Sequence, residues 1–238
     1  MTYASPHYVE ETRIGFHFLS SYTWQHHVLR VAINDLKRLI GEPPPQGGTL
    51  LDAGCGQGKS FRLLREAFQP TRLLGLDADP HSLALAEAEG EREGIVIDLH
   101  AADCAQIPLP DGSVDIVFCH QTFHHLVEQE RALDEFWRVL KPGGWLLFAE
   151  STKAYIDTWV IRWFFRHPMD VQKSADEYLE MLRQRGFVFA ASNVSFPYLW
   201  WSRSKDFGLL ERWGLCAPPP PGQREETLVN VAARKPVV

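Results

Sequence analysis

Three aspartates and a glycine-rich segment are the residues of this chain whose types and spacing could do chemistry. Asp52 stands immediately before the segment AGCGQG at residues 53–58, Asp77 ends a second apolar run 25 residues later, and Asp103 follows a third. Glycines let a ligand lie against main-chain atoms, and an aspartate at a strand end can accept both hydroxyls of a ribose. With one carboxylate for an ammonium group and another for the exocyclic amine of adenine, the three acids predict a ligand with ammonium, ribose and adenine but no phosphates.

Two phosphate-binding interpretations of the same glycines stay open. A dinucleotide site needs the pattern GxGxxG, and here Lys59 takes the position of the third glycine. A nucleotide-phosphate loop needs GxxxxGK followed by Ser or Thr, which GKS at residues 58–60 nearly matches, with Ala53 in place of the first glycine. The carboxylate of Asp52 at the mouth of that loop would repel a polyphosphate. The cationic ligand is therefore favoured over a P-loop-type ATP-binding protein and over a turn that binds nothing.

A second group of chemically active residues follows the apolar run at residues 114–119. His120 ends that region, His124 and His125 come shortly after it, and Glu150 ends the next apolar run. An imidazole in this place can act as a general base toward a nucleophile that carries a proton. The alternative for the histidine pair is packing against the core, and the alternative for Glu150 is a solvated acid at a strand end.

The elements that must position these residues alternate between strands and helices. Apolar runs predict strands at 49–52, 73–77, 95–101, 114–119 and 145–149. Helical patterns lie at 8–40, 62–68, 80–90 and 129–140, and later at 154–166 and 174–185. Two further strands are predicted at 187–196 and 227–233. Apolar strands that alternate with helices are typical of a parallel sheet covered on both faces.

Four sequence motifs follow one another between residues 50 and 150. They are LLDAGCGQG at 50–58, LLGLDADP at 73–80, the segment 101–126 around the fourth strand, and LKPGGWLLFAE at 140–150. In order and spacing they resemble the motifs of the class I S-adenosylmethionine-dependent methyltransferases. The resemblance implies an α/β, Rossmann-like doubly wound sheet of seven strands in the order 3-2-1-4-5-7-6, with strand 7 antiparallel. It also implies N-terminal helices, a lid in the C-terminal half, and S-adenosylmethionine as the cofactor.

The resemblance also implies which residues form the site. Those expected to bind the cofactor are Asp52, Gly54, Gly56, Gly58, Asp77, Ala78, Asp103, Cys104 and His120. A histidine pair after the fourth strand acts as the base in some O-methyltransferases of this class, so His124 or His125 is the expected catalytic base. Glu150 is expected to orient a histidine or the substrate.

Substrate recognition is expected from segments added to the sheet. We predict an N-terminal helical cap at 1–44 and a catalytic domain at 45–238, with substrate-covering insertions at 151–173 and 197–225. Five of the eight tryptophans lie beyond residue 150. This bias predicts an apolar or aromatic acceptor, methylated on oxygen in preference to nitrogen, sulfur or carbon. The residues expected to contact it are Tyr22, Trp24, His26, Trp159, Trp163, Trp200 and Trp201.

Composition and charge favour a small-molecule acceptor. The formal net charge is −6 and there is no basic stripe, which weighs against a nucleic-acid partner. An RNA or protein methyltransferase remains the alternative. The four cysteines include no CxxC pair, so we expect no metal site and reduced thiols in a cytoplasmic protein. We see no signal peptide and no run long enough to span a membrane, and we expect a monomer or homodimer.

Overall fold

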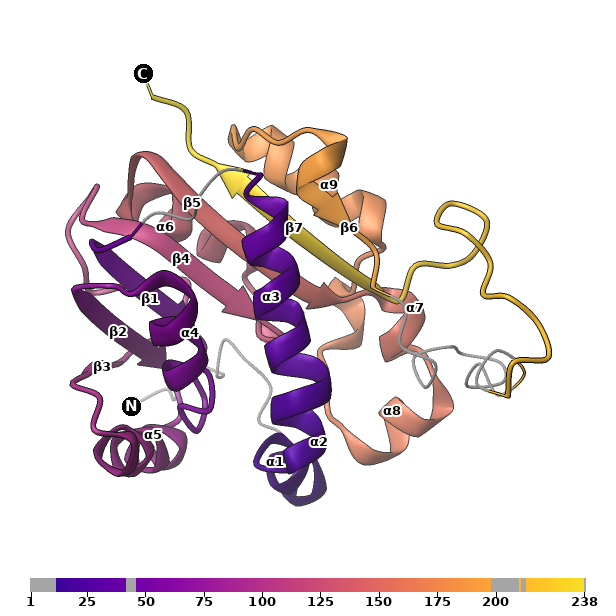
Figure 1. Ribbon diagram of the computed structural model, residues 1–238, viewed down its shortest axis with the longest axis horizontal. Helices are drawn as coiled ribbons and strands as arrows, with labels where there is room; N and C mark the ends of the chain where they lie inside the picture. Colours follow the sequence, from indigo (N-terminus) through magenta and orange to yellow (C-terminus); the bar gives the residue numbers. More distant parts are fainter. Residues whose placement is uncertain (1–11, 42–45, 198–209, 211–212, 238) are drawn as a thin grey trace, which may run out of the picture.

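The fold is built on one seven-stranded sheet (Figure 1). The computed structural model describes residues 12–41, 46–197, 210 and 213–237. The strands are β1 (Thr49–Ala53), β2 (Arg72–Asp77), β3 (Asp98–Ala101), β4 (Val114–His120), β5 (Leu140–Ser151), β6 (Val194–Ser195) and β7 (Leu228–Arg234). Their order is β3-β2-β1-β4-β5-β7-β6, and β7 is antiparallel to β5 and to β6. The predicted fold class, strand order and direction of strand 7 are confirmed.

Helices cover both faces of this sheet. Alternate side chains of a strand point to opposite faces, so Leu50 joins one core cluster and Leu51 the other. The first face is covered by α3 (Arg30–Leu39), α4 (Phe61–Phe68) and α5 (Pro80–Glu93), and the second by α6 (Gln129–Val139) and α9 (Ala175–Arg185). Strands buried on both faces explain the continuous apolar runs of the sequence.

Helix ends follow local capping chemistry. The side chain of Ser174 accepts a hydrogen bond from the amide of Glu177, whose carboxylate accepts one from the amide of Ser174, and α9 ends at Gly186 in the left-handed region. Asp79 caps α5 by accepting from the amides of His81 and Ser82. These reciprocal bonds satisfy amides that have no partner inside the helix, which is why the start of α9 was predictable from sequence.

The N-terminal region is not the single helix that its sequence predicts. It forms α1 (Arg13–Leu19), α2 (Tyr22–Trp24), a π-helical segment η1 (Gln25–Leu29) and then α3. The break falls at Ser21, whose side chain accepts a hydrogen bond from the amide of Trp24 and so begins a new helix. Within the predicted cap at 1–44, α3 lies in front of the sheet in Figure 1 and contacts β5 and β7. This part of the cap therefore forms a layer of the sheet domain.

The second half of the chain departs from prediction in one strand and in the helix predicted at 154–166, which is divided in two at Asp157 and Thr158. In place of a strand over 187–196 there is an isolated bridge between Val188 and Arg234, the 3-10 helix η4 (Ala191–Asn193) and the two-residue β6. The side chain of Asn193 accepts from the amide of Ala190 and donates to the carbonyl of Leu39, which folds the chain into a turn.

Short helices complete the fold. They are α7 (Lys153–Ile156), α8 (Trp159–Phe164), and the 3-10 helices η2 (Phe123–His125) and η3 (Met169–Val171). β5 begins five residues earlier than predicted, because the turn at residues 142–144 is drawn into a longer strand. No helix among the described residues is both long and apolar enough to cross a lipid bilayer.

Candidate active site

A cavity of about 640 Å³ lies where β1, β2 and β4 end. Its lining also includes residues of α1 and of the loop after β3. Of the residues predicted to bind the cofactor, those that line it are Asp52, Gly54, Gly56, Asp77, Ala78, Asp103, Cys104 and His120. Gly58 is not among the lining residues. The carboxyl edge of a parallel sheet is where ligands bind in open α/β folds, and here the topology brings the three acids to one cavity.

Asp77 is held rigidly at the end of β2. Its Oδ2 accepts a hydrogen bond from the amide of Gly56 at 2.8 Å, and its Oδ1 accepts one from the amide of Asp79 at 2.9 Å. Burial raises the pKa of this carboxyl, and the two backbone bonds act in the opposite direction. Each oxygen keeps a further lone pair, so the carboxylate is oriented and still able to accept two hydroxyl protons.

Asp52 is buried at the end of β1 and accepts a hydrogen bond from the hydroxyl of Ser60. Desolvation raises the pKa of Asp52 to about 7, opposed by the Ser60 bond and reinforced by the nearby charge of Asp77. Ionised Asp52 is poorly solvated because it is buried. A cation beside it would stabilise the ionised form, which lowers the pKa of the carboxyl and gives the cation a favourable binding free energy.

Two glycines of the loop, Gly56 and Gly58, require the absence of a side chain for different structural reasons. Gly56 has φ +51°, and no atom lies within 4 Å of the place where a Cβ would stand, so its backbone is open to a ligand. Gly58 has φ +72°, and a Cβ there would lie 2.5 Å from the ring of Phe61 and 3.0 Å from Cα of Ala86. Gly58 therefore serves the close packing of α4 and α5.

Helix α1 covers the glycine loop, a feature that the sequence did not reveal. The amide of the Gln57 side chain donates to the carbonyl of Phe16 at 2.8 Å. The ring of Phe16 stacks on His81, with 5.3 Å between centroids. Phe16, Gln57 and His81 all line the cavity. Gln57 stands between two glycines of the loop, and this position was the one sequence feature that could have placed it at the cavity. No sequence feature placed Phe16 there.

An aromatic wall, formed by Trp24, Phe118 and His120, bounds another part of the cavity. The ring centroid of His120 lies 5.5 Å from that of Trp24 and 5.8 Å from that of Phe118. Burial, with a smaller contribution from His124, lowers the pKa of His120 to about 3. His120 is therefore a neutral aromatic surface at physiological pH.

The turn after β4 is organised by a fully buried glutamate. Glu150 Oε1 accepts from the amides of Thr122 at 3.0 Å and Phe123 at 2.9 Å, and Glu150 Oε2 lies 2.6 Å from Nδ1 of His124. His124 is buried with it, whereas His125 lines the cavity. Breaking such a buried pair by removing one partner leaves the other without compensation. The interpretation of Glu150 as a solvated acid is therefore wrong.

Comparison with known proteins shows which family part of this chain resembles. Residues 51–148 match the family model described as a methyltransferase domain. A probable S-adenosylmethionine-dependent methyltransferase of Mycolicibacterium smegmatis is 34% identical over 142 residues, which cover 59% of this chain and 52% of that protein. Residues 51–148 therefore carry a methyltransferase domain, and this domain is similar to S-adenosylmethionine-dependent methyltransferases. The cofactor of this class is S-adenosylmethionine, as predicted.

Another relative matches the methyltransferase domain, and a solved structure shares the fold. A demethylmenaquinone methyltransferase of Thermus thermophilus is 35% identical over 101 residues, 42% of this chain and 46% of that protein. The chain thus spans about half the length of the relatives it matches. A methyltransferase structure from Aquifex aeolicus has a TM-score of 0.63 at 20% identity and covers 93% of this chain and 97% of its own. At that identity the likeness shows the fold alone.

In the methyltransferase domain, Lys59 and Ser60 of the partial P-loop motif form contacts with acidic side chains. Lys59 Nζ forms an ion pair with Glu89 at 2.7 Å, and Ser60 donates to Asp52. A phosphate-binding loop needs the lysine on the phosphates and the hydroxyl on a metal ion. The partial GKS match is therefore a coincidence of sequence.

The predicted substrate residues of the methyltransferase domain do not all reach its cavity. Trp24 lines it. Trp159 and Trp163 are 59% and 79% exposed, Tyr22 is 69% exposed and stacked on His26, and none of these four is among the lining residues. Trp200 and Trp201 lie outside the described residues, as do residues 198–209 and 211–212 of the insertion at 197–225. The aromatic wall of the cavity is formed by Trp24 together with Phe118 and His120 of β4.

Proposed function

We propose that this protein transfers the methyl group of S-adenosylmethionine to an oxygen of a small acceptor with an apolar or aromatic body. One observation carries the proposal: a single cavity is lined both by the acids and open glycine suited to the cofactor and by the aromatic wall with His125. One relative that is named for transfer to oxygen is a malonyl-[acyl-carrier protein] O-methyltransferase of Marinomonas, 27% identical over 62% of that protein. A dimethylglycine N-methyltransferase of Parasynechococcus marenigrum is 33% identical over 41% of that protein, so the choice of oxygen rests on the cavity and not on the relatives.

The cofactor half of the proposal assigns one group to each acid. Asp77 would accept the two ribose hydroxyls, because both of its oxygens are already fixed by the amides of Gly56 and Asp79. Asp52 would take the ammonium group, and Asp103 the exocyclic amine of adenine. Gly54, Gly56, Ala78, Cys104 and His120 would supply the remaining surface, and Gly58 would act only through helix packing.

The chemical step needs little from the protein beyond placement and a base. Bound S-adenosylmethionine would supply an activated methyl group to the acceptor oxygen, the carbon–sulfur electrons would pass to sulfur, and S-adenosylhomocysteine would leave. The acceptor proton passes to the imidazole of His125, the member of the histidine pair that lines the cavity. His124 and Glu150 hold the turn that carries His125 and act as positioning residues. Aromatic rings tolerate a sulfonium and help to hold it before its charge is lost.

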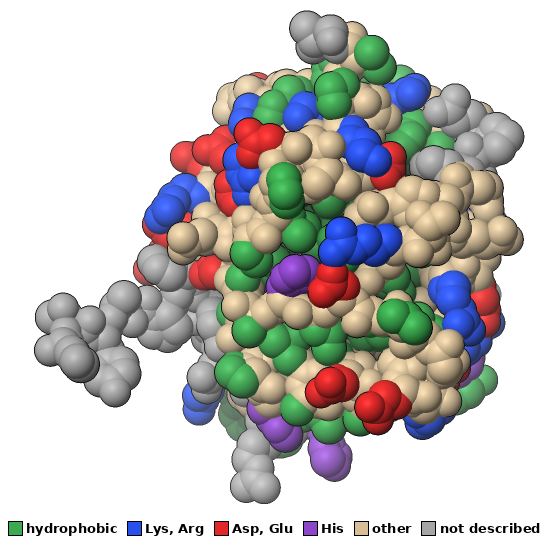
Figure 2. All heavy atoms as spheres, turned by 90° about the vertical axis from the view of Figure 1, so that its left-hand side faces the viewer, with side chains coloured by type: hydrophobic (Ala, Val, Ile, Leu, Met, Phe, Trp, Pro, Cys, Tyr) green, Lys and Arg blue, Asp and Glu red, His purple; other side chains and the backbone are tan. Residues whose placement is uncertain are grey.

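Surface charge supports a small acceptor over a nucleic acid. Acidic and basic side chains are interspersed on the face shown in Figure 2, and the net charge of the chain is −6. A nucleic-acid partner favours clustered lysines and arginines that neutralise phosphates.

Methyl transfer can be tested with labelled S-adenosylmethionine and a panel of phenols, quinols, aliphatic carboxylic acids, amines and thiols. We expect label in the phenol, quinol or carboxylate products, with mass spectrometry placing the methyl group on oxygen. Transfer to amines or thiols alone would contradict the oxygen assignment. Transfer to RNA or to a protein, with none to the small acceptors, would overturn the proposal.

Cofactor affinity should fall in acid because of Asp52. The free carboxyl has a pKa of about 7, and an ammonium group binds only its ionised form. Binding below that pH must therefore release a proton, so affinity should drop by about tenfold for each pH unit below 7 and level off above it. Isothermal titration of S-adenosylmethionine across this range in two buffers measures both the affinity and the released proton. Asp52→Asn should bind more weakly but without this dependence, and the same slope in that variant would refute the assignment.

A further inference from the structure

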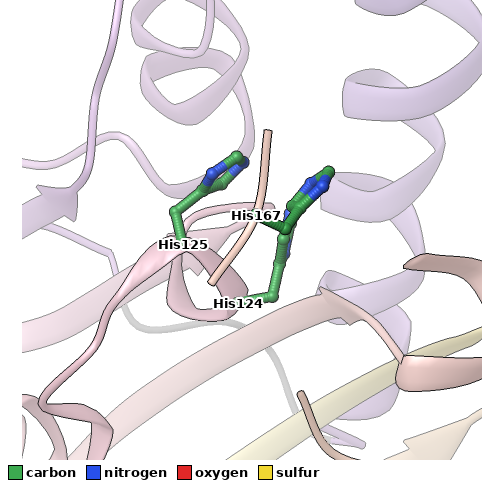
Figure 3. Close-up of side chains that lie close together, drawn as sticks. All are labelled: His124, His125 and His167. Atoms are coloured by element: carbon green, nitrogen blue, oxygen red, sulfur yellow. The ribbon is translucent and has the colours of Figure 1, made fainter. Parts of the chain in front are cut away.

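Three histidines gather beside the cavity, two of them from the turn after β4 and one from a distant segment. His124 and His125 belong to η2, and His167 lies between α8 and η3. One nitrogen from each lies within 4.8 Å of those of the other two. The ring centroids of His124 and His167 are 5.1 Å apart, and those of His125 and His167 are 4.6 Å apart. Figure 3 shows the three rings side by side; we call them the histidine cluster.

Glu150 fixes the orientation of His124 through a hydrogen bond with Nδ1 of its ring. Because Oε1 of this buried carboxylate accepts from two backbone amides, its Oε2 is left to take the Nδ1 proton of His124, 2.6 Å away. The Nε2 lone pair of His124 is then the one that remains available. A carboxylate that holds one nitrogen of a histidine while the other binds a metal is the usual arrangement around protein-bound zinc.

The two segments of the histidine cluster are tied together by Gln172. Its side-chain amide donates to the carbonyl of His124 at 2.8 Å and to the carbonyl of Pro168 at 2.9 Å. Pro168 directly follows His167, so these bonds hold His167 beside the turn that carries the other two rings. The cluster is therefore braced by a buried glutamate on one side and by a buried glutamine on the other.

We propose that the histidine cluster binds a divalent transition-metal ion of the Zn²⁺ class through one nitrogen each of His124, His125 and His167. Nitrogen atoms around a tetrahedral zinc ion lie about 3.3 Å apart. The three nitrogens all lie within 4.8 Å of one another, so they must approach by roughly 1.5 Å at most to bind one ion. Three histidine ligands leave one coordination position open, as in catalytic zinc sites. The sequence predicts no metal site because its cysteines lack metal-ligand spacing. Nothing in the sequence around His167 indicates that it lies near His124 and His125.

A bound ion would add a way to activate the acceptor in the proposed methyl transfer, and this consequence rests on the proposed function. Because His125 lines the cavity, the ion would stand at its wall, and its open position could take the acceptor oxygen. A metal-bound hydroxyl loses its proton far more easily than a free one. Without an ion His125 would take the proton itself; with an ion held by His124, His125 and His167, the ion would lower the pKa of the acceptor.

Titration with Co²⁺, a coloured substitute for zinc, tests the site in the full chain without a polyhistidine tag. We expect d–d absorption in the visible range that saturates at one ion per chain and disappears when Zn²⁺ is added. His167→Ala and His125→Ala should each weaken Zn²⁺ binding by about tenfold or more. His27→Ala, a change at an exposed histidine of η1, is the matched control and should bind as the unaltered protein does. Circular dichroism checks that each variant is folded.

Absence of the Co²⁺ absorption, or equal Zn²⁺ affinity in the unaltered protein, His125→Ala and His167→Ala, would overturn the metal site. Because the titration contains neither S-adenosylmethionine nor acceptor, its result is independent of methyl transfer. Failure of the acceptor panel would leave the metal site standing, and failure of the titration would leave the methyltransferase proposal standing.

Discussion

Replacing Asp77 by alanine should weaken S-adenosylmethionine binding by about 100-fold or more, because two charge-assisted hydrogen bonds to the ribose are lost and each contributes roughly 1.5–3 kcal/mol. The carboxylate is suited to this role by its fixed orientation. The amides of Gly56 and Asp79 hold its two oxygens at 2.8 Å and 2.9 Å, so little conformational entropy is lost when the ribose binds. Isothermal titration with S-adenosylmethionine and with S-adenosylhomocysteine measures the loss.

Two further variants make the Asp77 result interpretable. Asp77→Asn keeps the size of the side chain and one acceptor oxygen, so it should show a smaller but still large loss. Asp98→Ala removes an exposed carboxylate at the start of β3 and should leave the affinity unchanged. Thermal unfolding separates loss of binding from loss of folding. Normal affinity in a folded Asp77→Ala protein would show that another group holds the ribose.

Replacing His125 by alanine should lower kcat by about 10²- to 10⁴-fold, the range that a positioned general base contributes. Its affinity for S-adenosylmethionine should stay nearly unchanged, because the ribose, ammonium and adenine contacts are assigned to Asp77, Asp52 and Asp103. The same loss is expected whether His125 takes the proton itself or holds an ion that acidifies the acceptor. Steady-state rates on an oxygen acceptor, together with a cofactor titration, separate the two effects.

The matched control for His125 is His27→Ala, which should keep full activity because His27 is exposed on η1 and is not among the residues that line the cavity. An acceptor with an already ionised oxygen offers a second comparison, since it needs no base and should lose much less rate in His125→Ala. If His125→Ala turns over a phenol or quinol at the normal rate, His125 is not the base. If it loses cofactor affinity and rate together, its role lies in shaping the cavity.

The sequence determined the sheet and the cofactor edge of the cavity because both are encoded locally. Continuous apolar runs require strands buried on two faces, and an aspartate at the end of such a run must lie at the carboxyl edge of a parallel sheet. Asp52, Asp77 and Asp103 therefore meet in one cavity, as their positions along the chain predict. The capping box at Ser174 was equally readable, because its bonds join residues three apart.

Only the tertiary structure decided which aromatic side chains line the cavity. A count of tryptophans pointed to Trp159 and Trp163, yet these two are exposed outside the cavity lining, and the aromatic wall consists of Trp24, Phe118 and His120. Residue type gives the chemistry of a side chain, but its direction depends on the packing of its helix. His167 makes the same point, because a hydrogen bond across 48 residues, from Gln172 to His124, accompanies the meeting of the three rings. Contacts between segments so far apart leave no periodic trace in the sequence, and only the fold shows them.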